Sequence, residues 1–494
     1  MWQVSKETLI TFGLYLLAMI GVGALFCRKN ESIGEYLLGG RKIGSWVTAL
    51  SAQASDMSGW LLMGLPGAIF FAGMGEVWVA IGLALGTFAN WLVVAPRLRV
   101  YTEKVNALTL STFFANRFKD PTGMLRILSA VIILLFFAIY AGSGLVAAGK
   151  LFNSIFQVDY KTAVLIGSGV ILVYTLLGGY LAVCWTDFFQ GLLMFVALIA
   201  VPTLAWFGIG GWDQIQSCCD AREMSLNIIP QGESAAVAVM MILSSAVWGL
   251  GYFGQPHILS RFMSISSVKA LPRATTIAMI WVVISLFAAV MIGLVAIPYY
   301  AGLDKSASET VFIKLIQDLF NPYVGGVLLS ALLAAIMSTI DSQLLVSSSA
   351  LTEDFYRRVL RKNASEKELV WISRGFVLLI TVIAMVLALN PSDTIFGIVK
   401  FAWGGFGAAF GPVVIMALYS RKTTWQSALL GMFVGTVVML VWYFLGLNKY
   451  MYEILPGFIA GLVAMMIYNS IKPQKNDEIL QDYDAMLAEV KCKK

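Results

Sequence analysis

Charged residues are scarce in this chain of 494 residues. Only 13% of them are Asp, Glu, Lys or Arg, whereas 59% are hydrophobic and the mean hydropathy is +0.81. A soluble globular chain carries about 25% charged residues. So few charges cannot cover a water-facing surface, which excludes an ordinary cytosolic enzyme, a disordered protein and a disulfide scaffold. The composition instead indicates an integral membrane protein made of helices.

Cysteine and histidine are also rare, with five cysteines and the single histidine His257. The chain has no CxxC pair and no His/Cys cluster, so a zinc site of the usual kind is not expected. It has no G-x-x-x-x-G-K-[ST] run, which leaves an ATP-driven pump unsupported. A membrane-embedded enzyme would need a nucleophile–histidine set or a metal cluster, and a receptor would need a signalling domain. We expect no enzyme, no organic cofactor, no nucleic-acid partner and no obligate protein partner.

Long apolar runs are abundant, and thirteen of them reach the length of about 20 residues that crosses a bilayer. Their approximate limits are 8–27, 46–73, 75–95, 124–152, 160–178, 184–209, 235–254, 272–300, 322–352, 369–389, 394–418, 424–446 and 454–471. An odd number of spans puts the two termini on opposite sides of the membrane. With the N-terminus outside, 26 of the 34 Lys and Arg residues face the cytoplasm and 7 face outward. The positive-inside rule therefore predicts an external N-terminus and a cytoplasmic C-terminus.

The second apolar segment contains an unusual polar run, SAQASDMSG at 51–59. Polar side chains at this depth are costly unless they pair or line a cavity, and Ser, Asp and Gly weaken a helix. We expect an unwound stretch at 54–59, whose freed carbonyls would suit a cation. The alternative is an unbroken polar helix that lines the inside of the bundle.

The segment at 235–254 runs in the opposite direction and ends in the glycine-rich run WGLGYFGQP. Five spans separate its start from the start of the first polar segment. Spans two to six and seven to eleven can therefore form two halves of inverted orientation, each beginning with an interrupted helix. This arrangement is typical of secondary transporters with a site at the repeat interface.

Two adjacent hydroxyl residues, Ser338 and Thr339, interrupt the apolar segment at 322–352. At helical spacing they share a face with the Ala335 carbonyl. Carbonyls of Ala54 and Met57 in the expected break would complete a set of five neutral oxygens, which suits Na⁺ better than Ca²⁺. The alternative is that both hydroxyls bond only to carbonyls one turn earlier in their own helix.

Four separated runs carry a family resemblance: SAQASDMSGW (51–60), GGYLAVCWTDFFQG (178–191), WGLGYFGQPHILSRFM (248–263) and AAIMSTIDSQLL (334–345). Over nearly its whole length the chain resembles the sodium/solute symporter family. The resemblance implies a multi-pass protein of the bacterial cytoplasmic membrane with a leucine-transporter-type core of two five-helix inverted repeats. It also implies uptake of L-proline driven by Na⁺. The choice of proline as the substrate depends mainly on the third run. A symporter of the same fold for pantothenate, a sugar or a monocarboxylate is the alternative.

The resemblance also implies roles for individual residues of this chain. The sodium site would comprise the set already suggested by spacing, Ala54, Met57, Ala335, Ser338 and Thr339. Substrate contacts would come from Ser58, Gly59, Tyr140, Trp248, Tyr252 and Pro256, and ion movement or coupling from Arg41, Asp56 and Asp187. From residue type alone, Trp248 and Tyr252 could equally be an interface belt, Arg41 a positive-inside charge and Asp187 a helix cap.

The expected division of the chain follows from the two halves of inverted orientation. A first helix with its cytoplasmic loop would occupy 1–45, and the two repeats would occupy 46–209 and 235–418. Two C-terminal helices would span 424–471, followed by a cytoplasmic tail at 472–494.

Overall fold

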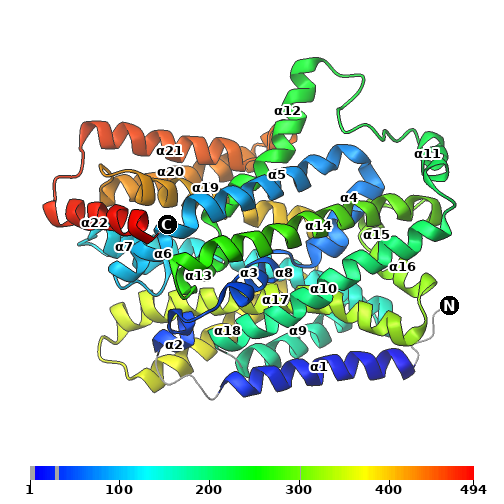
Figure 1. The fold of residues 1–494 in the computed structure, drawn as a ribbon, viewed down its shortest axis with the longest axis horizontal. Helices are drawn as coiled ribbons and strands as arrows, with labels where there is room; N and C mark the ends of the chain where they lie inside the picture. The colour runs from blue at the N-terminus through cyan, green and yellow to red at the C-terminus, as the bar shows by residue number, and fades with distance from the viewer. Residues whose placement is uncertain (1–5, 28–32, 178, 301, 494) are drawn as a thin grey trace.

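Helices make up the regular structure of this protein. The computed structural model describes residues 6–27, 33–177, 179–300 and 302–493. Within these ranges the one strand-like feature is an isolated bridge between Ile43 and Ile265. Most long helices run along the horizontal direction of Figure 1, with α1 beginning at the right and the tail helix α22 at the left.

Eleven helices in the described part of the chain are long and apolar enough to cross a membrane. The protein is thus a multi-pass membrane protein. Two further apolar helices, at Trp60–Ala72 and Tyr160–Leu176, are shorter. They coincide with parts of two of the thirteen expected spans, and the count of thirteen stays a prediction.

The long helices have the following bounds: α1 Lys6–Cys27, α5 Val77–Ala89 continued by α6 Ala95–Lys104, α8 Met124–Phe156, α9 Tyr160–Leu177, α10 Tyr180–Gly208, α14 Leu271–Tyr299, α17 Pro322–Ala350, α18 Glu366–Ala388, α19 Ile395–Tyr419, α20 Trp425–Phe444 and α21 Ile454–Ile471. Shorter helices connect or follow these long helices: α2 Ile33–Leu38, α7 Leu110–Phe118, α11 Trp212–Ala221, α15 Lys305–Ser308, α16 Val311–Leu319 and α22 Asp477–Lys493.

The first interrupted helix consists of α3 (Ser45–Asp56), a wide turn segment at Trp60–Gly64 and α4 (Leu65–Ala72). Only Met57 and Ser58 lie outside the helical segments, so the break is narrower than the expected stretch from residue 54 to 59. The helical hydrogen bonds continue to the end of α3, where the Met57 amide donates to the Gln53 carbonyl at 2.9 Å, and the Ser55 hydroxyl bonds to the Ala52 carbonyl at 3.2 Å.

The second interrupted helix is longer than the sequence predicts. It consists of α12 (Ala235–Ala246), a 3₁₀ segment at Val247–Gly254, an extended Gln255 and α13 (Pro256–Ser264). Proline suits the first turn of a helix because it lacks an N–H group to satisfy, so the chain resumes a helix where we expected an end. His257 therefore lies in α13. Figure 1 shows α12 leaving the bundle at the top.

Several of these helices are preceded by a residue whose side chain accepts a hydrogen bond from an amide of the first turn. Asn321 accepts from the Val324 amide at the start of α17, and Thr394 accepts from the Gly397 amide at the start of α19. Thr424 caps α20 in the same way, through the Ser427 amide. Asn and Thr are favoured here because their oxygens satisfy amides that have no partner inside the helix.

Glycines let α5 cross the second interrupted helix with the two backbones in contact. A Cβ atom at Gly86 would lie 2.3 Å from the Gly249 carbonyl oxygen, and one at Gly249 would lie 2.1 Å from the carbonyl oxygen of Gly82. Small residues at such crossings are typical of membrane helices, where packing rather than burial drives association. This contact holds the 3₁₀ segment of the second break in place.

We expect Gly86→Ala to destabilise the purified protein by roughly 1–3 kcal/mol, because the added methyl group has no space. Thermal unfolding followed in detergent measures this as a lower Tm. Gly169→Ala in α9 is the matched control, since its Cβ would meet nothing within 4 Å. Equal Tm values for both variants would contradict the tight crossing.

Candidate functional site

The end of α3 faces the middle of α17. Ser338 Oγ donates to the Ala54 carbonyl at 2.7 Å, and Thr339 Oγ1 lies 3.4 Å from the same oxygen. Both hydroxyls also lie near the Ala335 carbonyl, at 3.2 and 3.1 Å. The structure therefore brings together four of the five oxygens expected to bind Na⁺, and contains the alternative bonds within α17 as well.

The two hydroxyls supply the only side-chain protons of this cluster. Each hydroxyl carries one proton, so two protons are shared among the oxygens of Ala54, Ala335, Ser338 and Thr339. All four residues are almost completely buried. Within the described residues no group of three or more His, Cys, Asp or Glu side chains is placed to hold a metal ion. A neutral, proton-poor set of oxygens suits a monovalent hard cation.

Met57 lies in the break itself. Its backbone angles, φ −89° and ψ 80°, turn its carbonyl away from the direction of the helix, although its amide still donates to the Gln53 carbonyl at 2.9 Å. The residue is fully buried. A carbonyl turned out of a helix inside a membrane protein requires a partner.

Asp56 connects the two breaks. Its carboxylate accepts from the Tyr252 hydroxyl at 2.6 Å, and its carbonyl accepts from Trp60 Nε1 at 3.1 Å and from the Tyr140 hydroxyl at 3.2 Å. Tyr252 belongs to the 3₁₀ segment and Tyr140 to α8. The second carboxylate oxygen of Asp56 is buried without a hydrogen-bond partner. The Asp56 carboxylate thus retains one oxygen without a hydrogen-bond donor.

Aromatic rings surround this core. The Trp248 ring centroid lies 4.8 Å from that of Phe396 and 6.3 Å from that of Trp60. Tyr252 meets Trp403 edge to face at 5.0 Å. Trp248 is 1% exposed, which rules out an interface belt as the place of this side chain. These rings form an aromatic cage of Trp60, Trp248, Tyr252, Phe396 and Trp403. The cage lies directly beside the Asp56 carboxylate, because the Tyr252 hydroxyl donates to that carboxylate.

The remaining expected substrate residues lie around the same breaks. Ser58 is buried, and its hydroxyl accepts from the Trp60 amide at 3.4 Å. A Cβ at Gly59 would come within 2.8 Å of the Ala147 Cβ, so α8 approaches the backbone there. Pro256 lies further along the second helix and lines a small cavity of about 20 Å³ with Ser260.

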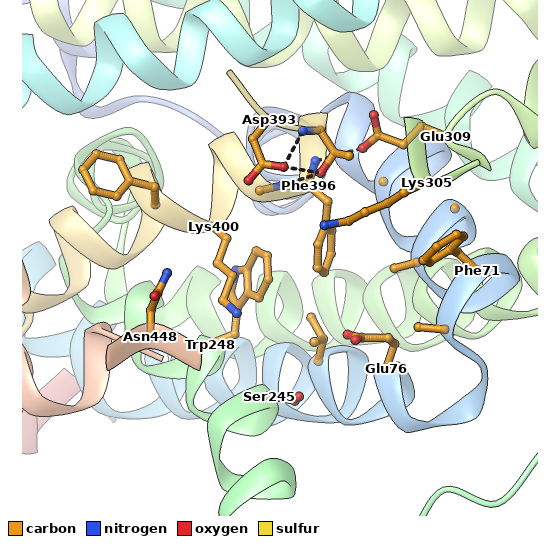
Figure 2. A pocket seen from close by; sticks show the side chains of 18 of the residues that line it. Phe71, Glu76, Ser245, Trp248, Lys305, Glu309, Asp393, Phe396, Lys400 and Asn448 are labelled. Atoms are coloured by element: carbon orange, nitrogen blue, oxygen red, sulfur yellow. Dashed lines mark hydrogen bonds between the residues drawn. The ribbon is translucent and has the colours of Figure 1, made fainter. Parts of the chain in front are cut away.

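A larger cavity of about 310 Å³ opens on the other side of Trp248. Figure 2 shows charged side chains around it, among them Glu76, Lys305, Asp393 and Lys400. The cavity beside Trp248 is much larger than the one beside Pro256, and the end of the site near Pro256 is called the closed end below.

Arg41 fastens the closed end. Its guanidinium donates to the Thr102 hydroxyl at 3.1 Å and to the carbonyls of Met263 at 2.7 Å and Ala107 at 2.6 Å. Burial lowers the pKa of Arg41 to about 10, which leaves the side chain charged at neutral pH. Arg41 is therefore more than a surface charge. The nearby Ile43–Ile265 bridge joins the chain before α3 to the chain after α13.

Asp187 lies inside α10, seven residues after its start, so the alternative of a helix cap is wrong: Gly179 occupies the N-cap position. Its carboxylate accepts from Arg261 at 3.0 Å and from the Ser51 hydroxyl at 2.7 Å. Arg261 also donates to the Ser342 hydroxyl at 2.5 Å. This fully buried ion pair joins α10 to α13. Through the Ser51 and Ser342 hydroxyls it also contacts α3 and α17.

Arg261, Trp60 and Phe396 are site residues that the sequence reasoning missed. Arg261 lies within the run WGLGYFGQPHILSRFM, where an arginine is itself a signal of a functional residue at membrane depth. Trp60 and Phe396 look like ordinary apolar residues of a span, and no local pattern marks them.

Two interrupted helices that meet around buried oxygens, within a bundle of membrane-length helices, define a secondary transporter. The model of the sodium:solute symporter family matches residues 36–435, and the chain belongs to that family. Its members are sodium-coupled transporters rather than enzymes, and the expected family is thus confirmed.

Relatives extend over nearly the full chain. The sodium/proline symporter of Salmonella typhimurium is 48% identical over 479 residues, which cover 94% of this chain and 93% of that protein. The high-affinity proline transporter PutP of Bacillus subtilis is 48% identical over 467 residues, which cover 94% and 98%.

Solved structures confirm the leucine-transporter-type fold. A Na⁺-coupled sialic acid symporter in a substrate-bound outward-open state has a TM-score of 0.80 at 17% identity, covering 96% of this chain and 100% of that one. MhsT in complex with L-phenylalanine has a TM-score of 0.52 at 15% identity, covering 86% and 98%. At these identities the likeness concerns the fold alone.

The buried ion pair yields a stability prediction. Asp187→Asn should lower the free energy of unfolding by about 3–5 kcal/mol, because it leaves the Arg261 charge buried and unpaired. The double variant Asp187→Asn/Arg261→Met should lose less than the sum of the two single variants. Tm values in detergent measure both effects, and strictly additive losses would contradict the coupling.

Proposed function

We propose that this protein couples the inward movement of Na⁺ to the uptake of L-proline by alternating access. The oxygen cluster between α3 and α17 is the observation that carries Na⁺ coupling. The substrate rests on relatives at 48% identity that are a sodium/proline symporter and a proline transporter. The energy is the Na⁺ gradient together with the membrane potential, about 2.3 kcal/mol per charge per 100 mV.

The proposed sodium site consists of the carbonyls of Ala54, Met57 and Ala335 and the hydroxyls of Ser338 and Thr339. The ion replaces the hydrogen bonds that now run from the two hydroxyls to the carbonyls. Each hydroxyl turns its proton away and offers a lone pair instead. Binding then holds the break in α3 against α17 in one arrangement.

The proposed proline site lies at the aromatic cage. Proline is a small zwitterion with an apolar ring, and Trp248 and Tyr252 supply faces for that ring and for a cation–π contact with its ammonium group. The start of the second half-helix at Gly59, beside the Ser58 hydroxyl, suits the carboxylate, because the first amides of a helix have no partner inside it. Tyr140 completes the wall through its bond to the Asp56 carbonyl, and Pro256 bounds the cage toward the closed end.

Asp56 and Tyr252 link the two sites. Asp56 lies between the Ala54 and Met57 carbonyls in sequence, and its carboxylate holds the Tyr252 hydroxyl. A shift of the break on Na⁺ binding therefore moves a side chain of the proline cage. By reciprocity, proline raises the Na⁺ affinity by the same factor as Na⁺ raises the proline affinity.

Release to the cytoplasm requires the closed end to open. The Arg41 contacts and the Asp187–Arg261 pair bridge the elements that must separate. Asp187 then offers a carboxylate to Na⁺ on its way inward, as Arg261 withdraws. Alternating access in this form is a movement of the two repeats, 46–209 and 235–418, around a fixed site. The parts at 1–45, 424–471 and 472–494 lie outside this core.

The orientation in the bacterial cytoplasmic membrane completes the proposal. The N-terminus faces outward and the C-terminal tail faces the cytoplasm, because 26 of the 34 Lys and Arg residues then lie inside. The cavity beside Trp248 accordingly faces the outside, where substrate and Na⁺ enter.

Uptake into proteoliposomes tests the coupling. We expect labelled L-proline to accumulate only with an inward Na⁺ gradient. Thr339→Val and Ser338→Ala should each raise the Na⁺ concentration for half-maximal uptake roughly 10–100-fold, since an ion–hydroxyl contact contributes about 1.5–3 kcal/mol.

Matched controls separate a lost ligand from a disturbed fold. Ser330→Ala removes a hydroxyl of the same helix that bonds only to the Gly326 carbonyl, at 2.8 Å. Thr381→Val does the same in α18, where the hydroxyl bonds to the Val377 carbonyl at 2.8 Å. Both should keep the parental Na⁺ dependence. Equal accumulation of proline with and without Na⁺ would refute the sodium site. Uptake of another solute in place of proline would refute L-proline as the substrate.

Thiol labelling tests the orientation. Cys492 lies exposed on α22, and Cys218 lies partly exposed on α11. In right-side-out vesicles a membrane-impermeant maleimide should label Cys218 and spare Cys492, and permeabilisation should expose Cys492. Labelling of Cys492 in sealed vesicles would reverse the proposed orientation.

A further inference from the structure

A long apolar groove lies between α8 and α20, on the surface of the bundle and apart from the transport site. Its volume is about 740 Å³. Met124, Val131 and Phe433 line it and are 50%, 55% and 56% exposed. Because α8 and α20 are both membrane-length helices, apolar side chains exposed along them face the acyl chains of the bilayer.

A polar pocket of about 330 Å³ continues this groove at the end of the bundle where α22 lies. The groove and the pocket share Trp425, Gln426 and Tyr468. Trp and Tyr at such a junction are typical of the boundary between the bilayer core and water. Groove and pocket together form one amphipathic cavity, apolar within the membrane and polar at its surface.

Two lysines line the polar pocket. Lys472 follows α21, is exposed, and forms no ion pair within the part of the chain that the structure describes. Lys119 lies opposite and pairs with Glu478 of α22. Lys472 therefore leaves an uncompensated positive charge at the mouth of the groove. The same end of the bundle carries Lys104 and Arg421, each paired with an acidic residue of α22.

The geometry points to a binding site for an anionic phospholipid of the cytoplasmic leaflet. One acyl chain lies in the groove between α8 and α20, and the glycerol region lies beside Trp425 and Tyr468. The phosphate meets Lys472 and the edge of Lys119. Basic pockets between membrane helices on the cytoplasmic side suit such head groups, and the groove and the pocket each lie in the size range of roughly 300–1,000 Å³ typical of ligand sites.

Charge decides between an anionic lipid and other occupants. A zwitterionic lipid fills the groove equally well but gains nothing from Lys472. A second copy of this chain would cover the apolar wall and leave the lysine pocket without a partner. L-proline does not suit a groove walled by Met124, Leu429 and Phe433.

Photo-crosslinking tests the site in the full-length protein. The probes are phosphatidylglycerol and phosphatidylcholine that carry the same diazirine-labelled acyl chain, each added to the protein in nanodiscs. We expect phosphatidylglycerol to label peptides 124–131 and 425–433 about fivefold more than phosphatidylcholine does, the gain that one lysine near an anionic group supplies.

Three variants make the result specific. Lys472→Gln should abolish the preference for phosphatidylglycerol, whereas Lys475→Gln, an exposed lysine that does not line the pocket, should keep it. Leu430→Trp fills the groove and should reduce labelling by both lipids. Parental proline uptake by Lys472→Gln verifies that it is folded.

Any of three results overturns the proposal. Equal labelling by both lipids shows ordinary boundary lipid. Preferential labelling that survives Lys472→Gln places the anionic group elsewhere. Efficient disulfide formation between two copies of a Leu430→Cys variant shows that the groove is an interface between protomers.

Discussion

The contact between the end of α3 and the middle of α17 is the interaction on which the rest of the site depends. A carbonyl near the end of a helix, Ala54, meets two hydroxyls from a helix that begins 268 residues later in the chain. The helix must stop near this point, because a continuing α3 would use the carbonyls that the site needs. The hydroxyls must lie on one face, which their adjacency and the spacing to Ala335 ensure.

This contact has few protons and no net charge, so the proposed function gives it two states. In the structure the hydroxyls bond to the carbonyls. With the proposed ion bound, all the oxygens would turn toward one centre and fix the break. Asp56 follows Ala54 by two residues and accepts a hydrogen bond from Tyr252. A change in the position of the Ala54 carbonyl would therefore also shift Tyr252 in the aromatic cage. A transporter needs such a connection, since an ion shifts a conformational equilibrium only through its different affinities for the two states.

Much of this arrangement could be predicted from the sequence. The polar run at 51–59 indicated a break, the Ser338–Thr339 pair indicated a hydroxyl face, and the glycines around Trp248 indicated a second break. These features are local, and each depends on the behaviour of one helix. The limits of the breaks were less accurate, because Ser55 could bond back to its own helix and Pro256 could start a new one.

The contacts between distant segments could not be predicted in this way. Arg261 and Asp187 are 74 residues apart and form their pair only after α10 and α13 are packed. Trp60 and Phe396 join the cage because α19 lies against the wide turn after the first break, which depends on the whole bundle. The lysines beside the apolar groove belong to a loop and to the end of α21, and only the fold places them together.

Equilibrium binding to the purified protein measures the coupling between the oxygen cluster and the aromatic cage. Labelled L-proline binding is measured over a range of Na⁺ concentrations, and ²²Na⁺ binding over a range of proline concentrations. We expect saturating Na⁺ to raise the proline affinity and saturating proline to raise the Na⁺ affinity by the same factor, with K⁺ unable to substitute. A proline affinity that does not change with Na⁺ would show that the oxygen cluster and the aromatic cage are not coupled, and would contradict the account.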